Sequence, residues 1–277
     1  MTRPAAVGAW VAAGLAVALG SADPVPQAVV LAGAWWLLAR RREPDRGLRP
    51  LAFGLVALAA ITVLVNGLLA HVGATVVVVV PSWVPLVGGQ LTTEGFIEGG
   101  AIALALVAAV SVTAVLSLVL EPADLVDALP RPLHRTGAAL GAALNLVPAT
   151  VASFVAVRDA QRLRGWRPKG PRAMVDLAVP VLLGAIERST ELAESMEARA
   201  FGSGPRTSAA ERERSGRAVV VVALAAASVV VLVVARLTGG PAWYPYPTPS
   251  VPAVTAVLLA PALLVAAAAL LVPAGTA

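Results

Sequence analysis

The sequence predicts an all-α, polytopic membrane protein with about six transmembrane helices and a cytoplasmic helical module. The first observation is composition: 58% of the 277 residues are hydrophobic and 13% are charged, against about 25% charged in an ordinary soluble domain. The second is that long apolar runs carry no charge, which is typical of membrane spans. The third is that the remaining charges gather in one interior third of the chain.

Six apolar runs are predicted to cross the membrane, where a span needs about 20 residues. Four runs reach that length by themselves, and the first two reach it with their flanks. The runs are 5–19, 25–39, 51–70, 96–120, 217–237 and 251–273.

The charges predict which side each loop occupies. Residues 40–49 contain five arginines and only two acidic residues, so this short loop is expected in the cytoplasm. Residues 50–130 contain no Lys or Arg, which puts 71–95 on the outer side. Within it, Val76–Val80 followed by two prolines indicates a broken or half-inserted piece. Both termini are then cytoplasmic.

The charged third divides the chain into 1–120 and 217–277, both transmembrane, and a cytoplasmic module at 121–216. Residues 121–217 hold 14 of the 21 basic and 11 of the 16 acidic residues. The module contains two further apolar runs, 137–157 and 173–186. If both crossed the membrane, the strongly basic turn between them would lie outside, so we expect interfacial or protein-packed helices instead.

Two helices of this module end alike, each with an arginine in its last turn before a glycine. The first ends at Arg164 and Gly165, and the second at Arg199 and Gly202. The helix dipole also favours a positive charge such as arginine at this end of a helix. The distance along the second helix, at about 1.5 Å per residue, places the two ends about 40 Å apart. A dimeric cytoplasmic motor fits that spacing, and an arginine fork suits carboxylates on it.

Other functions have weaker support in the residues. The chain has no Cys, and its two histidines lie far apart, so no metal or thiol site is expected. Its net charge of +5 does not predict nucleic-acid binding, because arginines beside spans set topology and contact anionic lipid. The single Lys169 lies in Pro-Lys-Gly-Pro, a poor phosphate loop.

Two alternatives stay open. One is a polytopic membrane enzyme with its site in the 121–216 insert. The other is a secondary transporter or scaffold, although internal repeats that would favour a transporter are not visible. The candidate residues of the enzyme are Glu187, Arg188, Glu191 and Glu194 with Arg158 and Arg162.

Motifs between about residues 90 and 207 resemble the transmembrane T component of energy-coupling factor (ECF) transporters, the EcfT/CbiQ-like family. The resemblance rests on Thr92–Phe96, Glu121–Leu129, Gln161–Gly165, Ser195–Gly202 and Arg206-Thr207. The family's paired Ala-Arg-Gly signatures correspond to Leu163-Arg164-Gly165 and Ala198-Arg199-Ala200. Both central arginines are kept, whereas the first Ala is Leu and the second Gly is Ala.

The resemblance implies the transmembrane coupling subunit of an ECF-type ABC importer in the cell membrane. Such a subunit transmits ATP-driven motion of two ABC ATPase subunits to a small substrate-binding S component, for uptake of a vitamin or metal ion. It is no enzyme and binds no cofactor itself; ATP-Mg belongs to its partners. The implied ATPase contacts are Arg162, Arg164, Gly165, Glu197, Arg199, Phe201 and Gly202. The implied S-component platform is Leu144, Val147, Val151, Leu177, Val181 and Leu182.

The resemblance leaves the substrate open among cobalt, nickel, biotin, thiamine-related compounds and other vitamins, because specificity belongs to the S component. It also leaves open whether the two ATPases are one gene product or two, and whether the importer module is dedicated or shared.

Overall fold

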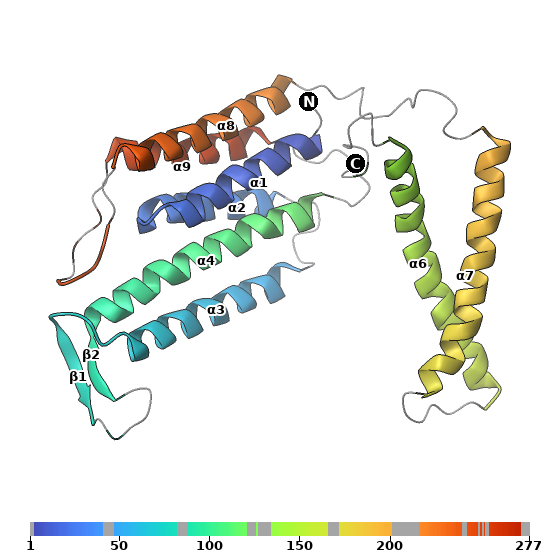
Figure 1. The fold of residues 1–277 in the computed structure, drawn as a ribbon, viewed down its shortest axis with the longest axis horizontal. Coiled ribbons are helices and arrows are strands. Elements are labelled where there is room, and N and C mark those ends of the chain that lie inside the picture. Colours follow the sequence, from blue (N-terminus) through green and yellow to red (C-terminus); the bar gives the residue numbers. More distant parts are fainter. Residues whose placement is uncertain are drawn as a thin grey trace. The chain divides into compact units, whose positions relative to one another are not determined.

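The computed structural model contains two compact units (Figure 1). Unit 1 comprises Met1–Glu121 and Glu213–Ala277, and unit 2 comprises Pro122–Arg212. These boundaries lie close to the expected limits of the 121–216 module. The structure describes residues 3–40, 47–81, 83, 88–120, 126, 134–165, 172–200, 216–239, 243–248, 250, 252 and 255–272.

In the part of the chain that the structure describes, unit 1 has six apolar helices, and they coincide with the six predicted spans. Of these, α3, α4 and α8 are long and apolar enough to cross a membrane, whereas α1, α2 and α9 are shorter apolar helices. The bounds are α1 Arg3–Gly20, α2 Pro24–Ala39, α3 Leu48–Leu69, α4 Thr93–Val119, α8 Gly216–Leu237 and α9 Ala256–Leu271.

The core of unit 1 joins the two ends of the sequence. Helix α1 packs against α8 and α4, and α2 packs against α4 and α9. At its centre the indole N–H of Trp10 donates to the carbonyl of Val265 at 2.8 Å, and both groups are buried. The hydroxyl of Ser228 on α8 donates to the carbonyl of Pro261 inside α9, also at 2.8 Å. Most other core side chains are Ala or Val, so the helices approach closely.

Helix α3 packs on α4 and leaves most of its surface exposed. Within α3 only Leu55 and Gly67 are buried. A Cβ at Gly99 of α4 would lie 2.9 Å from the Cβ of Asn66 and 3.2 Å from the Cα of Val63. The two backbones therefore touch where α4 has no side chain. The outer face of α3 is apolar, with Phe53, Val56 and Ile61 all well exposed.

A two-stranded antiparallel hairpin connects α3 to α4. Strand β1 is Val76–Val80 and β2 is Gly89–Thr92. A bulge lies between Val76 and Val78, and Val79 pairs with Gln90. At about 3.4 Å per residue, a five-residue strand reaches about 17 Å and is too short to span a bilayer. The expected broken piece is thus a β-hairpin.

Unit 2 contains two long helices, α6 (His134–Leu163) and α7 (Arg172–Ala198). Each has an internal proline, Pro148 in α6 and Pro180 in α7. The segment Ala139–Leu163 is long and apolar enough to cross a membrane, by length and composition alone. The positive-inside argument instead predicts that it does not, so charge and hydropathy point in opposite directions for this helix.

Gly99→Leu tests the contact between α3 and α4. The added side chain forces the two backbones apart, and overpacking of this kind costs about 1–3 kcal/mol, or about 2–4 °C in Tm per kcal/mol for a chain of this size. Thermal unfolding of the purified protein in detergent measures the loss.

The matched control is Gly100→Leu, the next residue of α4, whose added Cβ would have nothing within 4 Å. It should leave Tm almost unchanged. An equal loss for both variants would contradict the close contact.

Candidate functional site

Helices α6 and α7 cross each other (Figure 1), and a polar contact connects them. Arg188 of α7 donates from Nη1 to the hydroxyl of Ser153 on α6 at 2.7 Å. The other guanidinium donors of Arg188, Nε and Nη2, are buried and have no acceptor among the described residues. Among the described residues, one hydrogen bond therefore joins the two helices, and it comes from a guanidinium with two further donors that have no acceptor there.

Helix α6 ends at the first predicted arginine. The amide of Arg164 donates to the carbonyl of Ala160 at 3.2 Å, and the amide of Gly165 donates to the carbonyl of Arg162 at 3.0 Å. Gly165 then takes φ +82°, the left-handed conformation that closes many helices. Arg162, Arg164 and Gly165 are exposed, and Leu163 is 90% exposed.

Helix α7 ends in the same manner at the second arginine. The amide of Arg199 donates to the carbonyl of Ser195, and the amide of Ala200 donates to the carbonyl of Glu197. Ala200 takes φ +52°, as Gly165 does at the other end, although it carries a side chain. Glu197, Arg199 and Ala200 are exposed. Phe201 and Gly202, predicted to belong to this end, lie outside the described residues.

The two arginine-bearing ends lie far apart on the crossed pair. Figure 1 shows the end of α6 near the start of α7, whereas the end of α7 is at the opposite end of the pair. Helix α7 has 27 residues, which gives it a length of about 40 Å. Each end thus presents an arginine to solvent beside a left-handed closing residue.

The predicted platform residues divide into exposed and buried ones. Val147, Val151 and Leu182 are each 60% exposed, and Leu144 is half-buried. Leu177 and Val181 are buried within the chain. By helical spacing these two share one face with Arg188, the residue that contacts α6. Of the six expected platform residues, these two are therefore covered by the chain itself.

The residues suggested for an enzyme line neither of the two cavities that the described residues form in unit 1. Glu187, Glu191 and Glu194 are exposed along α7, and Arg188 is used at the crossing. Arg158 pairs with the adjacent Asp159 at 3.2 Å. Among the residues that the structure describes, no group of three or more His, Cys, Asp or Glu is placed to hold a metal ion.

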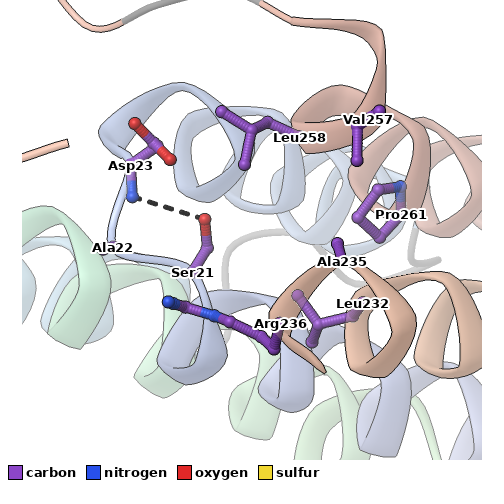
Figure 2. Close-up of a pocket in the computed structure, with 9 residues that line it drawn as sticks. All are labelled: Ser21, Ala22, Asp23, Leu232, Ala235, Arg236, Val257, Leu258 and Pro261. Carbon is purple, nitrogen blue, oxygen red and sulfur yellow. Dashed lines mark hydrogen bonds between the residues drawn. The ribbon is translucent and has the colours of Figure 1, made fainter. Parts of the chain in front are cut away.

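A small cavity in unit 1 lies where the α1–α2 turn meets α8 and α9 (Figure 2). Its volume is about 20 Å³, room for about one water molecule. Asp23 beside it is buried, and burial raises the pKa of its carboxyl while the charge of Arg236 opposes that rise. Arg236 donates to the carbonyl of Gly20, at the end of α1, where a cation is favourable. The hydrogen bond from Arg236 stabilises the end of α1, and a cavity of this size has no room for an organic substrate.

A larger hollow of about 400 Å³ lies beside the first turns of α4 and is mainly apolar. Its polar member, Ser250, already donates to the carbonyl of Tyr244 at 3.2 Å. The described residues of its lining provide no carboxylate, imidazole, amine or thiol. It is lined by Pro24, Ile97, Gly100, Ala101, Trp243, Ser250 and Pro252.

Ala200→Gly tests the strained end of α7. A non-glycine residue in the left-handed region costs about 1 kcal/mol, so glycine should stabilise the last turn and slow amide hydrogen exchange there about fivefold. Ala198→Gly, inside the helix, should have the opposite effect because glycine there costs about 1 kcal/mol. Exchange that changes in the same direction in both variants would refute the assigned strain.

Comparison with known proteins matches most of the chain to one family. The family described as "Cobalt transport protein" (CbiQ) matches residues 7–209. That range contains most of α1, all of α2, α3 and α4 in unit 1, and all of α6 and α7 in unit 2.

Individual relatives are all named energy-coupling factor transporter transmembrane protein EcfT. The Heliobacterium modesticaldum protein is 30% identical over 175 residues, 57% of this chain and 61% of its own length. The Staphylococcus aureus protein is 28% identical over 130 residues, 41% of this chain and 48% of its own. The Bacillus subtilis protein is 28% identical over 126 residues, which are 40% of this chain and 48% of its own length.

These matches span about half of the length of most of the relatives. The family match covers well over half of this chain, including both arginine-bearing helix ends. The chain therefore belongs to the CbiQ family of cobalt transport proteins, and it is similar to the EcfT transmembrane proteins of energy-coupling factor transporters.

Proposed function

We propose that this chain is the membrane-embedded coupling subunit of an ECF-type ABC importer. The observation that carries the proposal is the pair of exposed arginine-bearing ends, Arg164 and Arg199, at opposite ends of the crossed helices α6 and α7. Two separated, similar ends suit two similar partners. The names of the relatives, which are transporter membrane proteins, support the same assignment.

The partners at these ends are two ABC ATPase subunits, which hold the ATP-Mg. A guanidinium at an exposed helix end offers a rigid fork of donors to carboxylates or carbonyls on a partner. Glu197 and Arg162, one turn or less before the ends, are also exposed and complete each contact. The chain itself contributes no catalytic step.

Motion passes from the ATPases to the membrane through the crossing. When the ATPases close, they move the two ends toward or away from each other, and the angle between α6 and α7 changes. Among the described residues, one side-chain hydrogen bond joins the two helices, between Arg188 and Ser153, so the crossing tolerates such a change. The exposed side chains Val147, Val151 and Leu182 form the surface on which a small substrate-binding S component rests.

The proposal requires α6 and α7 to lie on the cytoplasmic side, with six spans in unit 1 and both termini inside. The strongly basic turn between α6 and α7 supports this orientation. The imported substrate is a vitamin or a metal ion, chosen by the S component.

Reversing both arginine charges tests the docking. Arg164→Glu and Arg199→Glu each replace attraction by repulsion, and each should lower recovery of the ATPases with the detergent-purified complex at least about tenfold, since about 1.4 kcal/mol is one order of magnitude. Arg158→Glu, the same change on the exposed side of α6, is the control and should retain them. Undiminished recovery after both reversals refutes the proposal.

The orientation has its own test, because the chain has no native Cys. Lys169→Cys, in the α6–α7 turn, should not react with a membrane-impermeant maleimide in intact cells, and should react after the membrane is opened. Tyr244→Cys, 63% exposed between α8 and α9, should react in intact cells. Labelling of Lys169→Cys in intact cells would place the arginine ends on the wrong side for a cytoplasmic ATPase.

A further inference from the structure

Strand β1 exposes apolar side chains on both of its faces. Successive side chains of a strand point to opposite faces, yet Val77, Val78 and Val79 are 56%, 50% and 67% exposed. Trp83, three residues after the strand, is 81% exposed. No face of this strand is covered by the described parts of the chain, so an apolar surface remains on each side of the hairpin.

The base of the hairpin is fastened firmly to unit 1. The carboxylate of Glu94, which is fully buried, accepts a hydrogen bond from the amide of Thr75 at 3.0 Å. The hydroxyl of Thr92 donates to the carbonyl of Val72 at 2.8 Å. The amide of Ala74 donates to the carbonyl of Pro247, in the segment between α8 and α9, at 3.0 Å. The direction of the exposed strand is therefore set by the helices.

That direction runs across the helices. Figure 1 shows β1 and β2 extending sideways from the end of α3 and the start of α4, across the direction of both helices. Because α3 and α4 are long and apolar enough to cross a membrane, an element that runs across their ends lies along the membrane surface. The exposed apolar face of α3 continues through Leu69 and Val72 into β1.

The lack of charge allows the hairpin to enter the membrane, and its unpaired backbone groups limit how deep it can lie. Residues 71–93 contain no Asp, Glu, Lys or Arg, so nothing charged holds it in water. Burial of a valine side chain contributes about 1.5–3 kcal/mol. In the described part of the chain, however, the sheet has two strands, and the outer edge of each leaves backbone groups outside the ladder, which is unfavourable in the hydrocarbon core. Both requirements are met together at the boundary between headgroups and acyl chains.

We propose that the β1–β2 hairpin is a lipid-binding element that lies in the bilayer surface, in the leaflet where α3 ends and α4 begins. The valines of β1 contact the upper parts of the acyl chains, and the free strand edges contact headgroups and water. The hairpin thereby fixes the depth of the α3–α4 pair in the membrane. This element is independent of the ATPase-docking role proposed for α6 and α7.

The test uses spin labels on single cysteines, which the Cys-free chain permits. Val79→Cys is labelled with a nitroxide, and the full chain is reconstituted into phosphatidylcholine nanodiscs. Collision with oxygen, which concentrates in lipid, is compared with collision with a water-soluble nickel chelate. Leu64→Cys, on the exposed face of α3, is the lipid reference, and Glu191→Cys, exposed on α7, is the water reference.

The proposal expects the oxygen-to-nickel ratio at Val79→Cys to be several-fold above that at Glu191→Cys and to approach that at Leu64→Cys. A ratio equal to that of Glu191→Cys would mean that the hairpin stands in water and would overturn the proposal. A label that neither reagent reaches would also overturn it, because the valines would then be covered by protein, such as a second copy of this chain. Val79 is exposed, so its replacement leaves the packed core intact.

Discussion

Close approach of helix backbones is the constraint on which unit 1 depends. Moving an apolar side chain from lipid to a protein interior lowers the free energy very little. A membrane bundle is therefore stabilised by packing and by a few hydrogen bonds between helices. The core is accordingly made mainly of Ala and Val, with Gly99 of α4 in contact with the backbone of α3. Trp10 and Ser228 add hydrogen bonds to carbonyls of α9 where the helices already touch.

The helices and their ends were readable from the sequence because each has a local cause. Charge-free runs of sufficient length predicted the six helices of unit 1, and the glycine after Arg164 predicted the end of α6. The structure adds that Ala200 takes the same left-handed conformation as Gly165. That similarity follows from the geometry of the helix end, and the residue type alone does not predict it.

Features that depend on contacts between distant residues were not readable. Leu177 and Val181 looked like a surface for a partner, but they share the face of α7 that carries Arg188. Arg188 looked like one charge on a solvated helix, and only its partner Ser153, 35 positions earlier, reveals the crossing. The hairpin was expected as a broken apolar piece, since five consecutive valines lack the alternation that marks a half-exposed strand.

The order of packing in unit 1 has a consequence for how the protein is made. Helices α3 and α4 are neighbours in sequence and pack together, so this pair can assemble as soon as it leaves the ribosome. Helices α1 and α2 also pack on α4, but α1 has a second partner in α8 and α2 has one in α9, and both of these follow the whole of Pro122–Arg212. At about 5–20 residues per second, that wait lasts on the order of 10–40 s. During biogenesis the small-residue faces of α1 and α2 remain without their C-terminal partners, and the bundle closes only when translation nears its end.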